Sequence, residues 1–242
     1  MESVESRQTE VIQANLDDIR RRIAAAAKSA GRSPEEIEIV AVTKGQSTPT
    51  LRAAAAADLA VFGENYVQEA LAKQNELADL PGLSWHFIGH LQSNKAAVVV
   101  GRFALIQSID SERLAGKVAL AAARSGITQN VLVQIHLGDE ESKFGVRPEE
   151  APALCERMAR QPSLALRGLM GIAPVTAEEG ARADPSPYFS RLRALFEDLP
   201  RENRQVLSMG MSGDFEAAVR EGATLVRIGT ALLGPRPTPV SH

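Results

Sequence analysis

Short apolar runs alternate with helical segments along most of this chain. The runs are rich in Val, Ile and Leu and carry few charges, which is typical of parallel strands that are covered on both faces. The predicted strands are Ile37–Thr43, Leu59–Gly63, Trp85–Ile88, Ala104–Ile109, Val131–Leu137, Leu166–Ile172, Gln205–Met209 and Leu225–Ile228. The helices predicted between them are Pro49–Ala57, Val67–Ala78, Ser93–Val100, Ser111–Ser125, Pro148–Arg160, Pro187–Leu199 and Asp214–Glu221.

This alternation limits the chain to a few α/β architectures. Strict βα order favours a parallel sheet, and about eight units in roughly 200 residues favour closure into a single (β/α)8 barrel. An open doubly wound sheet is the alternative, but no Gly-x-Gly-x-x-Gly motif follows the first strand. We therefore predict an N-terminal helix packed on the barrel in residues 1–35, the barrel in residues 36–234 and a loose Pro-rich tail in residues 235–242.

The segment before the first strand is predicted to form one long helix that ends at Gly31. Its apolar positions recur at helical spacing and should face the barrel; they are Val11, Leu16, Ile19 and Ile23. Three consecutive arginines, Arg20–Arg22, are better explained as the solvated face of this helix than as a phosphate or nucleic-acid site. In the first crossover, Thr48 is predicted to cap the helix, with Pro49 at its first position.

The composition is that of an ordinary globular protein, with 44% hydrophobic and 24% charged residues. A net charge of -3 without a long basic run gives no electrostatic case for binding nucleic acid. The longest apolar stretches, Ala53–Ala57 and Ala96–Val100, are too short to span a bilayer. The acidic N-terminus does not resemble a signal peptide. We therefore expect a cytoplasmic protein without membrane contact. We also expect a monomer, because no long exposed apolar stripe is evident beyond the N-terminal helix.

The single cysteine, Cys155, cannot form an internal disulfide and falls in a helical pattern, so we expect a small core residue in a reducing compartment. No cluster of His, Cys and carboxylate residues has the spacing of metal ligands. The sequence therefore predicts no metal site.

A lysine, Lys44, stands at the end of the first predicted strand. The carboxyl ends of barrel strands form the active-site face, and burying an unpaired ammonium is costly. One interpretation is a Schiff-base lysine whose lowered pKa lets its amine attack an aldehyde. The other is a lysine that snorkels to solvent at a strand end. Lys44 alone favours the second interpretation.

Two small, Gly-containing loops follow the last two strands. Ser208–Asp214 (Ser-Met-Gly-Met-Ser-Gly-Asp) leads into a helix, and Gly229-Thr230 begins the short terminal helix Ala231–Leu233. Their hydroxyl and N–H groups could bind a phosphate, and barrels commonly place phosphate sites in these two loops. Simple βα turns are the alternative. Arg227 lies within the last predicted strand, just before the Gly229-Thr230 loop. It either forms a structural ion pair or faces the ring nitrogen of a bound heterocycle.

A reactive lysine and a phosphate site, expected on opposite sides of one barrel mouth, describe a site for pyridoxal 5′-phosphate (PLP). At this point the chain resembles the pyridoxal-phosphate homeostasis proteins, the YggS/PROSC family. The resemblance rests on motifs spread over nearly the whole chain: Ala41–Lys44, Phe62–Glu69, Trp85–Lys95, Ser142–Gly145, Arg167–Met170, Leu207–Asp214 and Val226–Thr230. Thr43, where the family often has serine, is a minor departure.

The resemblance implies a barrel like the N-terminal domain of alanine racemase, with PLP held as an internal aldimine on Lys44. It implies that Ser212, Gly229 and Thr230 bind the phosphate. Ser208 and Gly210 would lie nearby, Arg227 would face the ring nitrogen, and Asn65 would lie near the cofactor. The resemblance also implies a protein that holds PLP without turnover and buffers or delivers it, which affects amino-acid and keto-acid balance. Other B6 vitamers and apoenzymes that depend on PLP are the implied partners.

The alternative function is a PLP-dependent amino-acid racemase, which needs an acid or base on each face of its substrate. The chain ends just after the eighth strand, without the domain that supplies the racemases with a second group. Tyr188 is expected in a crossover helix away from the mouth, so Tyr66 is the one candidate for that role. A barrel that uses Lys44 on a sugar phosphate is a remote third possibility.

The remaining polar residues of the predicted strand ends have ordinary structural explanations. His86 is expected to be a hydrogen-bonded core histidine, whereas His90 at the mouth could contact the cofactor or a partner. Lys95 and Lys143 could attract an anionic vitamer, although solvated lysines are the usual case.

Overall fold

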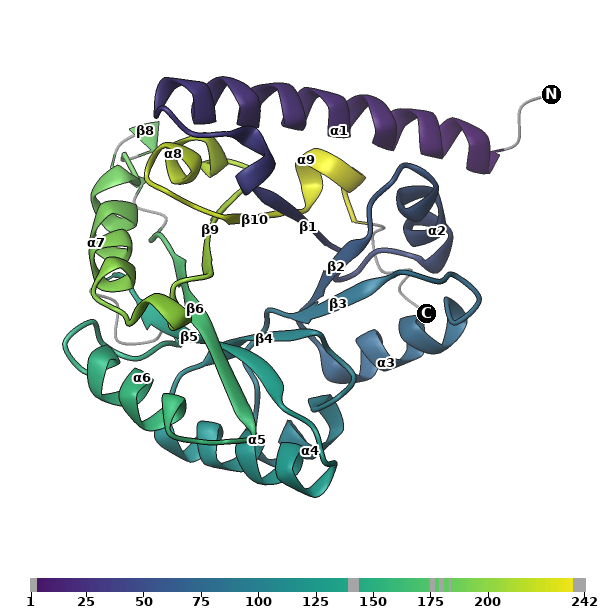
Figure 1. Ribbon diagram of the computed structural model, residues 1–242. Coiled ribbons are helices and arrows are strands. Elements are labelled where there is room, and N and C mark those ends of the chain that lie inside the picture. Colours follow the sequence, from purple (N-terminus) through teal and green to yellow (C-terminus); the bar gives the residue numbers. More distant parts are fainter. Residues whose placement is uncertain (1–3, 139–143, 175–176, 179–180, 183, 237–242) are drawn as a thin grey trace.

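The chain folds into a closed barrel of parallel strands surrounded by helices (Figure 1). This computed structural model describes residues 4–138, 144–174, 177–178, 181–182 and 184–236. The barrel strands are β1 Glu38–Val42, β2 Val61–Glu64, β3 Ser84–Phe87, β4 Leu105–Ile109, β5 Gln129–His136, β6 Leu164–Ile172, β9 Val206–Met211 and β10 Leu225–Ile228. Around the barrel their order is β1-β10-β9-β6-β5-β4-β3-β2. The predicted (β/α)8 barrel is confirmed.

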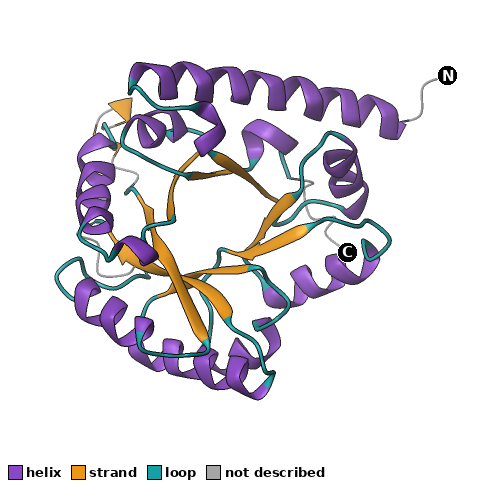
Figure 2. Cartoon of the chain, viewed as in Figure 1, coloured by secondary structure: helices purple, strands orange, loops and turns teal. Residues whose placement is uncertain are grey.

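Helices cover the outside of the sheet (Figure 2). They are α1 Val4–Ser29, α2 Thr48–Ala56, α3 Val67–Glu76, α4 Ala96–Val99, α5 Glu112–Arg124, α6 Ala151–Ala159, α7 Ser186–Glu197, α8 Phe215–Arg220 and α9 Thr230–Leu233. Within the described ranges, short 3-10 turns connect some of these elements; they are η1 Pro34–Glu36, η2 Ser93–Lys95 and η3 Arg201–Asn203. Among the described residues, no helix is both long and apolar enough to cross a membrane.

Three local predictions need correction. The helix expected over residues 93–100 is divided into η2 and α4. A short antiparallel pair, β7 Ala177–Glu178 and β8 Ala181–Arg182, lies between β6 and α7, where no strand was expected. The cap of α2 is Ser47, whose hydroxyl accepts a hydrogen bond from the Thr50 N–H at 3.4 Å; Thr48 is the first helical residue.

Helix α1 lies across one side of the barrel, against α2, α8 and α9 (Figure 1). Its buried side chains recur at helical spacing; they are Ile12, Leu16, Ile19, Ile23, Ala26 and Ala27. The prediction that Val11 faces the barrel is wrong, because Val11 is 55% exposed and its neighbour Ile12 takes that place. Of the three arginines, Arg22 pairs with Glu216 and its guanidinium lies 4.6 Å from the Phe215 ring centroid, so it holds α1 to α8.

Cys155 in α6 is buried, and burial raises the pKa of its thiol to about 11. At neutral pH the side chain is therefore an uncharged thiol in the hydrophobic core, as predicted.

We expect Leu16→Ala to lower the free energy of unfolding by about 3 kcal/mol, because it leaves a cavity where α1 meets the barrel. Leu16 is fully buried. Val11→Ala on the exposed face of the same helix should change stability by less than about 0.5 kcal/mol. Urea unfolding followed by circular dichroism measures both, and equal losses would mean that α1 does not pack as described.

Candidate functional site

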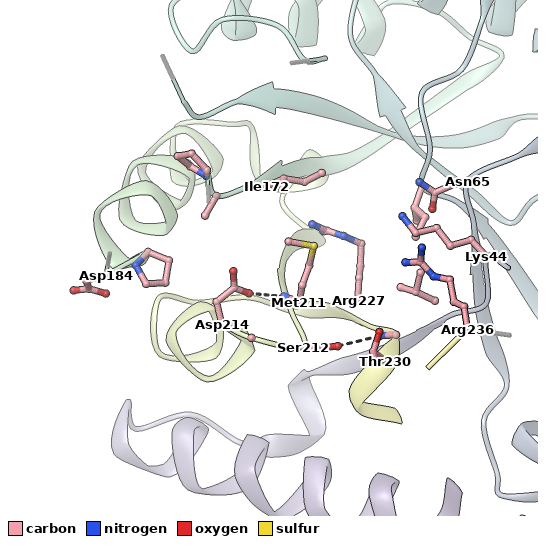
Figure 3. A pocket seen from close by; sticks show the side chains of 17 residues that line it. Lys44, Asn65, Ile172, Asp184, Met211, Ser212, Asp214, Arg227, Thr230 and Arg236 are labelled. Carbon is pink, nitrogen blue, oxygen red and sulfur yellow. Dashed lines mark hydrogen bonds between the residues drawn. The ribbon is translucent and has the colours of Figure 1, made fainter. Parts of the chain in front are cut away.

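A cavity of about 410 Å³ opens at the carboxyl ends of the strands. The residues that line it come from strand ends on several sides of the barrel (Figure 3). They are Val42, Lys44, Asn65, Ile88, Ile172, Ala173, Pro174, Asp184, Pro185, Met211, Ser212, Gly213, Asp214, Arg227, Gly229, Thr230 and Arg236. The cavity thus brings together six of the eight predicted site residues.

Lys44 lies in the turn after β1, two residues beyond the end of the strand, and is half-buried. The turn is closed by the Gln46 N–H, which donates to the Thr43 carbonyl at 3.0 Å. Gly45 occupies its third position with φ +69°, a conformation that favours glycine. The Lys44 side chain extends toward the cavity beside Asn65 and Arg236 (Figure 3).

Several charges act on the Lys44 amine. Burial is the main cause that lowers the pKa of Lys44, and the Arg236 cation lowers it further, whereas the carboxylates of Glu64 and Glu69 raise it. The net direction is downward. A larger fraction of the amine is therefore unprotonated and nucleophilic near neutral pH than for an exposed lysine.

The loops after β9 and β10 lie beside Lys44, so the expectation that the two groups stand on opposite sides of the mouth is wrong. Strand β1 pairs directly with β10, with Val40 opposite Arg227 and Ala41 opposite Ile228. A barrel closes by pairing its first strand with its last, and this closure places the residues after β10 next to those after β1.

These loops present a group of hydrogen-bond donors. The Ser212 hydroxyl accepts from the backbone N–H groups of Gly229 at 3.3 Å and Ala231 at 3.5 Å. The Asp214 carboxylate accepts from the Met211 N–H at 2.6 Å and shapes the preceding loop. Ser212, Gly229 and Thr230 all reach the cavity. Because the Gly229 N–H already donates to Ser212, the Ser212 O–H and the Thr230 N–H are the donors available there to an anion.

Arg227 brings a buried cation to the cavity, 4% exposed. It donates to the Ser208 hydroxyl at 2.6 Å and to the Gly171 carbonyl at 2.9 Å. Burial lowers the pKa of Arg227 to about 10, with the Asp214 charge acting in the opposite direction, so the guanidinium stays protonated at neutral pH. No carboxylate forms an ion pair with it among the described residues. The cation is thus left to face the cavity.

A chain of buried hydrogen bonds crosses the barrel behind Arg227. The Ser208 hydroxyl donates to Gln107 Oε1 at 2.7 Å, and Gln107 Nε2 lies 3.2 Å from Nδ1 of His86. Since the Gln107 oxygen takes the hydroxyl proton, its amide donates to His86, whose Nδ1 must be unprotonated. Burial also lowers the pKa of His86 to about 4. The prediction of a hydrogen-bonded core histidine is confirmed.

Two predicted site residues lie outside the cavity lining. Ser208 is fully buried and orients Arg227. Gly210 has φ +89°, and a Cβ there would lie 2.6 Å from the Ala218 Cβ, so glycine allows β9 to pack closely on α8. Their contribution to the site is therefore indirect.

A second hollow, of about 540 Å³, adjoins the cavity and shares Asn65, Ile88 and Ile172 with it. His90 and Tyr66 line this hollow instead of the Lys44 cavity. The His90 ring stacks on Phe144 with centroids 3.6 Å apart, and its Nδ1 lies 3.4 Å from Asp110. Lys95 also lines it, whereas Lys143 lies outside the described residues.

One polar atom of the cavity lacks a partner. Asn65 Oδ1 is buried and accepts no hydrogen bond from the described residues. Buried polar atoms are nearly always paired, so this oxygen fits a site that a bound molecule completes. In the described ranges, no group of three or more His, Cys, Asp or Glu side chains could hold a metal ion.

The polar residues that support the site were not expected from the sequence. Lys73 in α3 is buried and pairs with Glu64 at 2.8 Å and Glu69 at 2.6 Å. Gln107 and Arg236 were also missed. The i,i+4 spacing of Glu69 and Lys73 was visible, but such pairs usually lie on a solvated helix face.

The chain matches a known class of proteins over most of its length. The family model of the alanine racemase N-terminal domain matches residues 14–237, so the chain belongs to that family. An alanine racemase from Streptomyces coelicolor, 20% identical, shares the fold with a TM-score of 0.69; the match covers 96% of this chain and 60% of that one.

Within this class, the chain belongs with the pyridoxal phosphate homeostasis proteins. One from Pseudomonas aeruginosa is 47% identical over 222 residues, which cover 92% of this chain and 94% of that protein. One from Aquifex aeolicus is 41% identical over 91% of this chain and 96% of that protein. The structure of PipY from Synechococcus elongatus with PLP bound is 36% identical, with a TM-score of 0.78 over 92% of this chain and 100% of that one.

The depressed pKa of His86 predicts that the fold loses stability in mild acid. Unfolding restores a pKa near 6.5, so between pH 6.5 and 4 the unfolded chain binds more protons and stability falls with the pH. The full loss is about 3 kcal/mol. Urea unfolding at pH 7 and pH 4.5 should show a smaller pH dependence for His86→Gln than for wild type.

Cys155→Ala is the matched control, since this buried residue does not titrate in that range. Its loss of stability should be the same at both pH values. An unchanged pH dependence in His86→Gln would show that this histidine is not the titrating group.

Proposed function

We propose that this protein binds PLP, with Lys44 as the covalent attachment point. The observation that carries the proposal is that a half-buried lysine with a lowered pKa shares one cavity with the donors of Ser212, Gly229 and Thr230 and with the buried Arg227 cation. PLP supplies an aldehyde that condenses with a primary amine. The PLP-bound PipY structure supports the assignment.

The residues fit each part of the cofactor. The hydroxyl of Ser212 and the loop of Gly229 and Thr230 would bind the phosphate, helped by the positive charge of Arg236. Arg227, held by Ser208, would face the ring nitrogen. Asn65 would accept a hydrogen bond through its unpaired Oδ1. Ser208 and Gly210 would contribute from behind, by orienting Arg227 and shaping the loop.

We further propose that the protein holds PLP without turning over amino acids. A cation at the ring nitrogen opposes its protonation and so weakens the ring as an electron sink. Racemisation also needs a second acid or base, and the described lining of the cavity holds no Tyr, His or Cys side chain. Tyr66 is 64% exposed and lines the adjoining hollow instead. The relatives are named homeostasis proteins.

The role that follows is to buffer PLP and deliver it to apoenzymes, and so to maintain vitamin B6 and amino-acid/keto-acid balance. We propose that the protein acts as a monomer and also binds other B6 vitamers.

The attachment is tested by adding PLP to wild type and to Lys44→Ala, and then reducing with borohydride. We expect a long-wavelength absorption band and a reduced adduct on the peptide that holds Lys44 in wild type only. Lys117→Ala, on an exposed lysine of α5, is the matched control and should behave as wild type. An adduct that persists in Lys44→Ala would refute the assignment.

The same samples decide the class of function. After incubation with L-alanine, chiral chromatography should find no D-alanine above the level seen with Lys44→Ala. Steady formation of D-alanine by wild type would make the racemase interpretation correct.

The phosphate assignment predicts a change in vitamer preference. Ser212→Asp places a carboxylate at the donors and should weaken PLP binding at least about tenfold through charge repulsion. Binding of pyridoxal, which lacks the phosphate, should change by less than about threefold. Ser212→Asn is the control, because it has the shape of Asp without the negative charge. If Ser212→Asp weakens the binding of PLP and of pyridoxal equally, the phosphate binds elsewhere.

A further inference from the structure

Side chains of α3 hold both peptide groups that flank the Cα of Lys44. The Thr43 carbonyl, which precedes Lys44, accepts a hydrogen bond from Nζ of Lys73 at 2.7 Å. The Gly45 N–H, which follows Lys44, donates to Oε1 of Glu69 at 2.6 Å. Glu69 and Lys73 lie one turn apart on α3 and contact each other at 2.6 Å. One helix therefore fixes the peptide plane on each side of the reactive lysine.

The Lys73 ammonium that does this is buried and all its donors are used, whereas Oε2 of the neighbouring Glu64 has no partner among the described residues. Lys73 is 6% exposed, and its three N–H donors go to Thr43, Glu64 and Glu69. Glu64, at the end of β2, is fully buried and also accepts from the Thr43 hydroxyl at 2.6 Å. With all three donors engaged, the Lys73 amine does not compete with Lys44 for an aldehyde in the cavity, which it does not line. The set thus joins β1, β2 and α3 directly beneath the Lys44 turn.

A buried ion pair is a costly way to stabilise a fold, since well-packed apolar residues often stabilise it as much or more. Its location at the two peptide groups next to Lys44 points to orientation as its role. A reacting group that is misplaced by about 1 Å can lose as much as a hundredfold in rate.

We propose that Glu69 and Lys73 are positioning residues for Lys44, which hold its backbone so that the amine projects into the cavity. This inference rests on the proposed attachment of PLP. Neither residue lines the cavity, so both act through the turn and do not touch the bound cofactor.

Glu69 has two separable effects on Lys44. Its carboxyl oxygen holds the Gly45 N–H, and its charge raises the pKa of Lys44, as does the charge of Glu64. Arg236, packed against Gly45, acts in the opposite direction, and Arg227 is the further cation of the cavity. Glu69→Gln removes the charge but keeps an oxygen acceptor, whereas Glu69→Leu removes both.

The test is the rate of PLP attachment, followed by the long-wavelength absorption band from pH 6 to 10. Both variants lose the charge, so in both the midpoint of the rate profile should move to lower pH. On the high-pH plateau, where the amine is unprotonated, Glu69→Gln should stay within about threefold of wild type. Glu69→Leu should be at least about tenfold slower. Glu10→Leu, an exposed substitution of the same kind on α1, should match wild type.

Equal plateau rates for Glu69→Leu and Glu69→Gln, with folded circular dichroism spectra, would overturn the positioning role. If Glu69→Leu does not fold, Glu69→Ala removes the same acceptor without adding an apolar side chain and is judged by the same plateau. The result for wild type distinguishes failure of the proposed function from failure of this inference. If it forms no band, the proposed function fails; if it forms one and Glu69→Leu forms it equally fast, only this inference fails.

Discussion

The pairing of β1 with β10 closes the barrel, and the arrangement of the site depends on this seam. It places the turn that carries Lys44 next to the loop of Gly229 and Thr230, although the two are far apart in the chain. The last helix, α9, spans only Thr230–Leu233 and covers little of the seam. Helix α1 packs there against α2, α8 and α9, and Asn15 donates to the Leu232 carbonyl at 3.0 Å. The N-terminal helix thus completes the wall behind the site.

Two buried polar networks fix the cavity from different directions. One runs from His86 to Arg227 through the barrel interior, and it holds a guanidinium at the cavity surface without a carboxylate partner. The other is the Lys73 set beneath the Lys44 turn. Burying these charges is costly unless every donor is satisfied. Both networks reduce the free energy of unfolding but fix the positions of the side chains around the cavity. Precisely placed polar groups are characteristic of sites that bind a small molecule in one orientation.

This arrangement is compatible with the proposed role of a racemase-type barrel as a cofactor carrier. The residues proposed to bind a phosphorylated aldehyde share one cavity with Lys44, whereas the described lining holds no Tyr, His or Cys side chain to act as a second acid or base. The adjoining hollow, with exposed Tyr66 and Phe144, keeps one side of the mouth accessible. Accessible water hinders carbanion chemistry but is compatible with exchange of the cofactor.

The sequence alone determined the order of the elements, because strand and helix periodicities are local, and it singled out Lys44 and the loops after β9 and β10 because their residue types are unusual at strand ends. It misjudged whatever depends on distant contacts. Closure of the barrel decides that Lys44 lies beside those loops and that Ser208 and Gly210 lie outside the cavity lining. Tertiary packing also decides that Ile12, and not Val11, faces the core. The i,i+4 spacing of Glu69 and Lys73 is typical of a solvated helix face. Only the packing of α3 against β2 buries Lys73 beneath Lys44, since burial is decided by tertiary neighbours and not by local spacing.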